Sequence, residues 1–345
     1  MAVFVSRRSA LQSVAGAASA IALPSAARAQ SVPIRVGYVP VIGASALFVM
    51  DGAGWAKEAG LDLKLTRFDS GPAAIQAFGS GTLDALAIGI APVAVARAKG
   101  LDVKVVSAAG TGGSAFVASA ALGEKFAAAN GDQAKAFAAF RAATGRRAKL
   151  ATLPPGGVPT VALSHWLFKL GKVDPADVEV VQMGIDAVQQ AMLAGTADGG
   201  TVLEPSATIV VGRKPELKRI ATAQQMFPEI PGVVLAVTGA FEKAQPDALQ
   251  KLVGLMVRAT DLIVKTPKDA APHVVKALGA GIVEESTMTA ALSSPAVGFL
   301  SNPAEIVAPT QAMLAYQVEI GDFPTAPAIA GLFDPQYWQR ASAGK

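Results

Sequence analysis

One short pattern occurs twice in this chain: residues 76–84 read QAFGSGTLD and residues 190–198 read QAMLAGTAD. The two copies align without gaps. Each reads as the end of a helix, a glycine turn that caps this helix, and the start of a strand. A proline then opens the next helix, Pro92 after the first copy and Pro205 after the second. A repeat this distant is not a solenoid period, so it predicts two similarly built α/β lobes.

Strand-like and helix-like stretches alternate on both sides of the two copies. The predicted strands are residues 34–39, 61–68, 83–90, 103–109, 149–153, 178–183 and 201–203, with helical stretches between most of them. Such βαβ units predict mostly parallel sheets that are covered by helices on both faces. After a further extended run at 233–238 the chain is mainly helical. Its clearest helix is 246–266, where apolar residues form one stripe.

The N-terminal residues have the order of an export leader. Arg7 and Arg8 precede an apolar run at 10–23, and Ala27-Arg28-Ala29 is a small-x-small cleavage site. The arginine pair in its Ser-Arg-Arg-x-x-Leu context resembles the twin-arginine type of leader. We therefore expect a signal peptide at 1–29, export by the twin-arginine machinery and cleavage after Ala29. An ordinary secretory leader or an amphipathic first helix is the alternative.

Composition excludes several classes of site and partner. Cysteine is absent, which removes disulfides, a thiol nucleophile, cysteine-ligated metals and a lipidated cysteine anchor. Cleavage after Ala29 leaves 345 − 29 = 316 residues with a net charge of 27 − 26 = +1. This length indicates two domains. No block of Lys and Arg with interleaved aromatics remains, so we expect no nucleic-acid partner.

Several short segments follow one another in a fixed order from about residue 34 to residue 240. They are 36–40 (VGYVP), 52–62 (GAGWAKEAGLD), Ser70-Gly71, 81–84 (GTLD), Gly89 with Pro92, 154–157 (PPGG) and Glu204-Pro205. In order and spacing they resemble the solute-binding proteins of ABC importers for nitrate, sulfonates, taurine and thiamine-type pyrimidines.

The resemblance implies a periplasmic binding protein type II fold. Two doubly wound α/β lobes would be joined by two crossing strands, with the ligand in the cleft between them. We place lobe I at 31–116 plus 236–345 and lobe II at 117–235, with the crossings near 114–120 and 233–238. It further implies a monomeric periplasmic protein that captures a small solute, closes by a hinge motion and delivers the solute to the membrane subunits of an ABC permease.

Candidate ligand-binding residues follow from the parallel sheets, because ligands bind beyond the carboxyl ends of the strands, where loops lead into helix N-termini. The loops at these positions give the following residues: Tyr38, Pro40, Ser45, Ser70, Gly71, Gly89, Ile90, Ala91, Thr111, Ser114, Pro155, Gly156, Gly157, Val158, Gly184, Ile185 and Glu204. The loops are rich in small residues and contain no Lys or Arg. Helix N-termini suit an anion without a countercharge, such as a sulfonate, taurine or nitrate. A neutral heterocycle fits nearly as well.

Structural roles compete with ligand contact at several of these positions. Ser70 is also a helix cap, and Gly156-Gly157 is also a tight turn. Glu204 is also a first-turn carboxylate favoured by the helix dipole. Tyr38 is also a core or rim residue.

Two other function classes share this kind of fold. An enzyme needs catalytic side chains, yet the chain has only two histidines, His165 and His273, and no metal-ligand spacing, phosphate loop or nucleophile elbow. We therefore expect no enzyme, no cofactor and no metal. A ligand-sensing regulator or receptor needs a DNA-binding or membrane domain, for which the sequence shows no segment.

Overall fold

Two five-stranded sheets organise the computed structural model, which describes Met1, residues 31–278 and residues 283–343. The first sheet has the order β2–β1–β3–β11–β4, with β1 Val32–Tyr38, β2 Leu61–Arg67, β3 Ala85–Gly89, β4 Val103–Ala108 and β11 Val233–Thr238. The second has the order β10–β6–β9–β7–β8, with β6 Ser114–Ala118, β7 Ala148–Thr152, β8 Val178–Gln182, β9 Gly199–Leu203 and β10 Lys218–Thr222. A small ladder pairs β5 Thr111–Gly112 with β12 Val297–Gly298.

The two sheets have the same internal plan. In each, one strand lies between two parallel neighbours, β1 between β2 and β3, and β7 between β8 and β9. Each sheet then holds one antiparallel strand, β11 between β3 and β4, and β6 between β9 and β10. The predicted α/β fold with two lobes is therefore confirmed. We call the first sheet with its helices lobe I, and the second lobe II.

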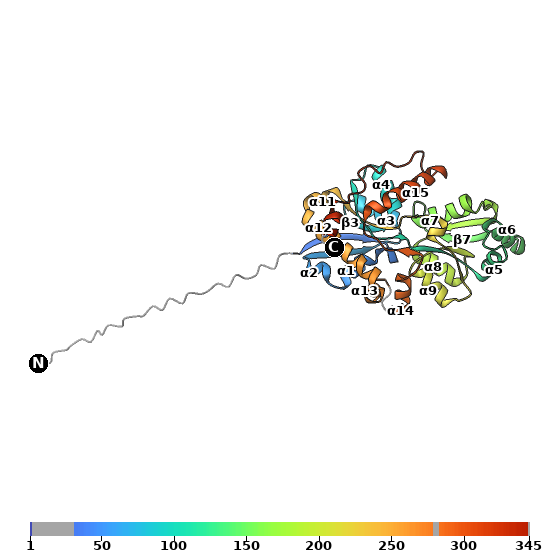
Figure 1. The fold of residues 1–345 in the computed structure, drawn as a ribbon, viewed down its shortest axis with the longest axis horizontal. Helices are drawn as coiled ribbons and strands as arrows, with labels where there is room; N and C mark the ends of the chain where they lie inside the picture. The colour runs from blue at the N-terminus through green and yellow to red at the C-terminus, as the bar shows by residue number, and fades with distance from the viewer. Residues whose placement is uncertain (2–30, 279–282, 344–345) are drawn as a thin grey trace. The chain divides into compact units, whose positions relative to one another are not determined.

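Helices pack around each sheet. They are α1 Ser45–Gly52, α2 Trp55–Glu58, α3 Gly71–Gly79, α4 Ile90–Ala98, α5 Ala120–Ala128, α6 Gln133–Thr144, α7 Val158–Ser164, α8 Ile185–Ala194, α9 Ser206–Arg213, α10 Ala223–Met226, α11 Gly239–Ala244, α12 Pro246–Lys265, α13 Pro267–Leu278, α14 Glu285–Leu292, α15 Val307–Glu319 and α16 Gln336–Ser342. A π-helical segment, His165–Leu170, extends α7, and short 3₁₀ segments lie at Ile42–Ala44, Pro175–Asp177 and Pro303–Ile306. Figure 1 shows α5–α9 gathered around β7, away from α1, α2, α11 and α12.

The C-terminal helices return to lobe I. The helix α12 packs against α1, α13 and α16, and α16 packs against β4. The predicted apolar stripe of this helix is confirmed, because its members are all buried: Leu249, Leu252, Leu255, Met256, Ala259 and Ile263. No helix in the described part of the chain has the length and apolar character to cross a membrane.

The chain passes between the sheets twice, at residues 109–113 and 227–232. These two segments lie side by side, because Gly112 N–H donates to Ile230 O (3.0 Å) and Gly232 N–H donates to Gly110 O (3.1 Å). The strands that follow them, β6 and β11, each lie wholly in one sheet. The passages thus come a few residues before the ranges expected from the sequence, and the expected boundaries after residues 116 and 235 fall inside strands.

The repeated nine-residue pattern holds the same interactions in both lobes. Asp84 ends the first copy, and its carboxylate accepts from the backbone N–H of Arg35 (2.9 Å), while its own N–H donates to Arg35 O (2.8 Å). Asp198 ends the second copy and makes the same two bonds with Lys149, both 2.8 Å. An arginine side chain also forms an ion pair with each carboxylate, Arg35 with Asp84 at 2.7 Å and Arg146 with Asp198 at 2.6 Å. The pattern therefore ties β3 to β1 and β9 to β7.

These two aspartates predict how stability responds to acid. Burial alone raises the pKa of each carboxyl, but hydrogen bonds from the partner arginine and the strand backbone outweigh it, so the pKa of Asp84 and of Asp198 lies below its ordinary value. A lowered folded-state pKa gives stability that is present above the unfolded pKa of about 3.9 and is lost as the pH falls through the folded value. We expect Asp84→Asn and Asp198→Asn to unfold at lower urea concentration at pH 7, with the difference from the wild type shrinking below about pH 4. Urea titrations between pH 7 and pH 3 measure this, and a difference that stays constant over the range would contradict the assignment.

Candidate functional site

A cavity of about 60 Å³ lies between the two lobes, at the carboxyl ends of their parallel strands. Residues at or just beyond the ends of β1, β3, β7 and β9 contribute to it, together with the passages between the lobes. The lining residues are Val39, Val41, Gly71, Gly89, Pro92, Gly112, Leu153, Gly157, Val158, Pro159, Leu203, Gly232 and Val233. None of these residues carries a charge.

Three helices begin at this cavity. Gly71 is the first residue of α3, Gly89 is the N-cap of α4, and Gly157 is the N-cap of α7, which the π-helical segment continues. The N–H groups in the first turn of a helix have no acceptor inside their own helix. A proline within each first turn, Pro72, Pro92 or Pro159, removes one of these donors. Of the other first-turn donors, the N–H of Ala73 donates to Ser70 Oγ, that of Ile90 to Gly232 O and that of Thr160 to Gly157 O. The positive ends of three helix dipoles thus lie at the cavity, with at most the N–H groups of Gly71, Ala91 and Val158 left as first-turn donors.

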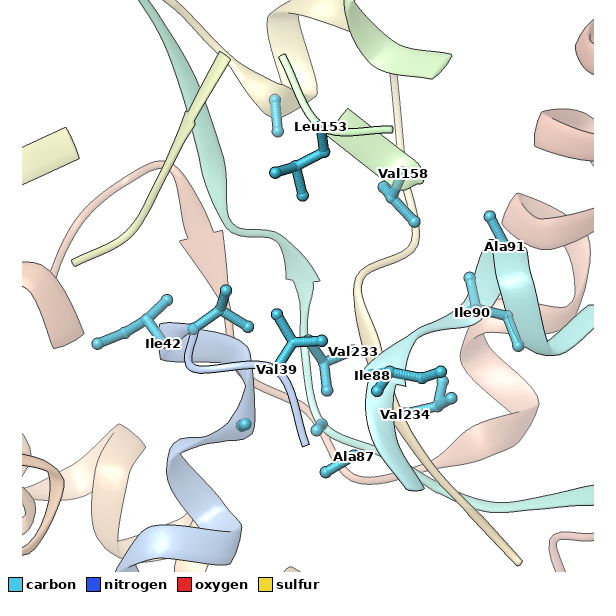
Figure 2. Close-up of a cluster of buried hydrophobic side chains, with 14 of the residues drawn as sticks. Val39, Ile42, Ala87, Ile88, Ile90, Ala91, Leu153, Val158, Val233 and Val234 are labelled. Atoms are coloured by element: carbon cyan, nitrogen blue, oxygen red, sulfur yellow. The ribbon is translucent and has the colours of Figure 1, made fainter. Parts of the chain in front are cut away.

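The walls of the cavity are apolar. In Figure 2, Val39 and Val233 of lobe I face Leu153 and Val158 of lobe II across the space between the lobes. All four are nearly buried, with exposed fractions of 5 to 8%. The site therefore combines backbone N–H donors with hydrocarbon walls.

In this cavity Gly89 of lobe I lies close to Val158 of lobe II. A Cβ at this position would lie 3.2 Å from Cγ2 of Val158. The backbone of Gly89, with φ −58° and ψ 144°, is one that any residue adopts, so only the facing lobe restricts this position. A side chain here would therefore hold the lobes apart.

Of the residues predicted as ligand contacts, Gly71, Gly89, Gly157 and Val158 line this cavity. Ile90 and Ala91 follow Gly89 in the first turn of α4, where both are buried. The N–H of Ile90 donates to Gly232 O (3.0 Å), so this donor is already used. The structure thus brings these predicted residues together at one place.

Three other predicted residues do not line this cavity. Ser45 is the first residue of α1, fully buried, and its Oγ has no hydrogen-bond partner among the described residues. Thr111 lies in β5, and Ser114 begins β6 with 2% of its surface exposed.

A second, more polar groove of about 520 Å³ lies between the lobes and holds predicted residues Pro40 and Ile185. Across it, Arg67 of lobe I forms an ion pair of 2.5 Å with Asp186 of lobe II. Gly184 is the N-cap of α8, and the N–H of Ile185 makes a long contact of 3.5 Å with Asp69 O of lobe I. These contacts join the lobes at the surface.

The remaining predicted residues have local roles. Ser70 caps α3 by accepting from the N–H of Ala73 at 3.4 Å. Tyr38 packs edge-on against Phe48 with ring centres 5.1 Å apart, and burial raises the pKa of its hydroxyl. Pro155 and Gly156 line a different cavity of about 220 Å³ beside α7 and the end of α15.

Glu204 is fully buried, and its carboxylate is held by protein groups. Oε1 accepts from Arg219 Nη2 and from Ser294 Oγ, both at 2.9 Å, and Oε2 accepts from the N–H of Thr208 at 3.0 Å. Its backbone O accepts from the N–H of Ile42 in lobe I at 2.9 Å. This arrangement indicates a structural role that links β9, β10 and the C-terminal segment.

Sequence reasoning did not select the apolar wall of Val39, Val41, Leu153, Leu203 and Val233. Val39, Val41, Leu153 and Leu203 lie at or shortly after the ends of apolar strands, and Val233 begins one, so each reads as a core residue. The signal available was positional, because these residues flank the selected glycines at the carboxyl edge of the sheets.

The two histidines lie away from the cavity lining. His165 is buried against Phe227 and Tyr316, and its Nδ1 lies 2.8 Å from Met226 O. Burial lowers the pKa of this imidazole. His273 lies on α13 beside Gly52. Within the described ranges, no group of three or more His, Asp or Glu side chains is placed to hold a metal ion.

Comparisons with known proteins give the family. The model of the NMT1-like family matches residues 27–279. A Brucella abortus protein assigned as a binding protein is 25% identical over 260 residues, covering 74% of this chain and 75% of that protein.

Two solved structures share the fold. The periplasmic nitrate-binding protein NrtA from Synechocystis has a TM-score of 0.76 at 14% identity, covering 91% of this chain and 89% of that one. The alkanesulfonate-binding protein SsuA from Xanthomonas axonopodis pv. citri, bound to MOPS, has a TM-score of 0.68 at 15% identity, covering 89% and 99%. The fold expected from the resemblance is thereby confirmed. Because the family model matches well over half of the residues of this chain, the chain belongs to the NMT1-like family.

Proposed function

We propose that this protein is the periplasmic solute-binding component of an ABC importer and that it captures a small oxyanion, such as a sulfonate or nitrate. The observation that carries this proposal is the cavity between two α/β lobes at the start of three helices. The similar structures are named for nitrate and alkanesulfonate binding, which supports the same solute class here.

The electrostatics of the cavity favour a compact anion. Each helix N-terminus carries roughly half a positive charge, and three of them begin at one small volume. Neither an acidic side chain nor a competing cation lines it. Backbone N–H groups can therefore bind the oxygen atoms of an anion without a formal countercharge.

Binding would proceed by hinge closure. The paired segments 109–113 and 227–232 form the connection about which the lobes rotate, and the contacts Gly89–Val158 and Arg67–Asp186 form as the lobes meet. We propose that the closed, loaded form is what the permease recognises. In this proposal lobe I and lobe II are the two lobes expected from the sequence, with the boundaries between them moved to residues 109–113 and 227–232.

The remaining parts of the proposal rest on the sequence. The predicted signal peptide at 1–29 with its cleavage site after Ala29 lies, apart from Met1, outside the residues that the structure describes. We propose twin-arginine export to the periplasm, a monomeric mature protein, and binding without catalysis or a cofactor. The similar solved structures are named as binding proteins, which supports binding rather than catalysis.

A thermal-shift panel tests the function. Methanesulfonate, propanesulfonate, taurine, nitrate, bicarbonate and an aminopyrimidine are each added at increasing concentration. A bound solute at about 100 times its dissociation constant adds roughly 2.7 kcal/mol of stability. A response to oxyanions supports the proposal, whereas a response to the aminopyrimidine alone would assign a neutral heterocycle. Silence across the panel, or chemical turnover of any compound, would contradict it.

A further inference from the structure

The apolar walls of the cavity bear on which oxyanion it accepts, an inference that rests on the proposed function. Lobe I contributes Val39, Val41 and Val233, and lobe II contributes Leu153, Val158 and Leu203. Figure 2 shows Leu153 and Val158 opposite Val39 and Val233, so hydrocarbon faces the solute from both lobes. A solute held here by its oxygen atoms must place the rest of its surface against these side chains.

The cavity offers little to a cationic group. Its lining contains no Asp, Glu, Tyr, Ser or Thr. Glu204 follows Leu203 in the chain, but its carboxylate is already bound by Arg219, Ser294 and the N–H of Thr208. An ammonium group in this cavity would therefore lose its water without gaining a carboxylate partner.

Several backbone carbonyls of the lining are also in use. The O atom of Val39 accepts from the N–H of Val41 (2.8 Å), that of Leu153 from Thr160 Oγ1 (2.7 Å), and that of Gly232 from the N–H of Ile90 (3.0 Å). Each bond occupies one lone pair of its carbonyl oxygen, which makes these oxygens weaker acceptors for an ammonium group.

The size of the cavity restricts the apolar part of the solute. A volume of about 60 Å³ leaves room for a small solute only. Val158 closes one side, where its Cγ2 approaches Gly89, and Leu153 lies beside it. Shortening either side chain would lengthen the space without removing a backbone donor.

We propose that this wall makes the protein selective for oxyanions whose remainder is short, uncharged and apolar, and that Val158 and Leu153 determine this selectivity. Taurine and propanesulfonate form a matched pair, since they differ by an ammonium group in place of a methyl group. The protein binds propanesulfonate at least 100-fold more tightly than taurine. Among unbranched alkanesulfonates its affinity falls beyond a short chain.

The test is calorimetric titration of the full-length protein with taurine and with the unbranched sulfonates from methane- to hexanesulfonate. The variants are Val158→Ala, Leu153→Ala and Val158→Thr, and the matched control is Val264→Ala, which makes the same change at an exposed position of α12. Val158→Ala and Leu153→Ala shift the preferred chain length upward by about one or two carbon atoms. Val158→Thr keeps the volume but adds a hydroxyl acceptor, and reduces the preference for propanesulfonate over taurine at least fivefold.

The outcomes separate this inference from the function on which it rests. A wild-type preference of at least 100-fold, with a chain-length shift in the alanine variants and not in Val264→Ala, supports it. The inference is overturned if the affinity for taurine lies within tenfold of the affinity for propanesulfonate. It is also overturned if Val158→Ala and Leu153→Ala leave the dependence of affinity on chain length unchanged. In both cases the proposed sulfonate binding still stands. If neither sulfonates nor nitrate bind the wild-type protein, both the inference and the proposed function are overturned.

Discussion

Gly89→Val lowers the affinity of the protein for its oxyanion at least 100-fold, a change of about 2.7 kcal/mol in binding free energy. The added side chain meets Val158, because even a Cβ at this position lies 3.2 Å from the Cγ2 of that residue. The contact joins the two lobes, so the substitution opposes closure. The backbone angles of Gly89 are ordinary, and the free protein keeps its Tm within about 2 °C.

Calorimetric titration combined with thermal unfolding measures both quantities. Gly254→Val in α12 is the control, since a Cβ there meets no atom within 4 Å. Gly89→Ala has an intermediate effect, and the double variant Gly89→Ala with Val158→Ala regains affinity, because the second change removes the opposing methyl groups. Wild-type affinity in Gly89→Val would show that the lobes do not meet at this position in the bound state.

Glu204→Ala lowers the free energy of unfolding by about 2–4 kcal/mol. Removal of one partner from a buried ion pair costs about 3–5 kcal/mol, and the lower figure reflects the partial exposure of Arg219, whose side chain is 26% accessible. The substitution deprives Arg219, Ser294 and the N–H of Thr208 of their acceptor at once. Urea unfolding of the two proteins at pH 7 measures the difference.

Two further variants, Glu204→Gln and Glu124→Ala, are compared with Glu204→Ala in their free energies of unfolding. Glutamine keeps the shape and one acceptor oxygen, so it destabilises the protein less than alanine does. Glu124 is an exposed residue of α5, and its replacement changes the unfolding free energy by no more than about 0.5 kcal/mol. A Glu204→Gln protein with unchanged stability but strongly reduced solute affinity would contradict the structural role. It would indicate that Glu204 binds the solute.

Much of the fold could be predicted from local patterns. The turn that ends in Asp84 recurs at Asp198, and in both places the carboxylate binds the backbone of a neighbouring parallel strand, β1 or β7. The apolar stripe of α12 is a further local signal, and all of its members are buried. The antiparallel insertion of β6 and β11 was harder to predict, because it depends on pairing between strands more than 80 residues apart along the chain, which is further than a βαβ unit reaches.

The site was only partly predictable for related reasons. Gly71, Gly89 and Gly157 stand out because small residues before a helix leave room for a ligand, and all three lie at the cavity. Leu153 and Val233 do not stand out, since an apolar residue at a strand end looks the same whether it faces the core or a cleft. The role of Glu204 depends on Arg219 and Ser294, which lie 15 and 90 residues further along the chain, and no local pattern indicates that meeting.

A crystal structure of the protein with propanesulfonate tests the central claim most directly. The account predicts closed lobes, with the sulfonate oxygens within about 3.2 Å of first-turn N–H groups of α3, α4 or α7 and the propyl group against Val158 and Leu153. The sulfonate bound outside this cavity, or held there by a charged side chain, would contradict it.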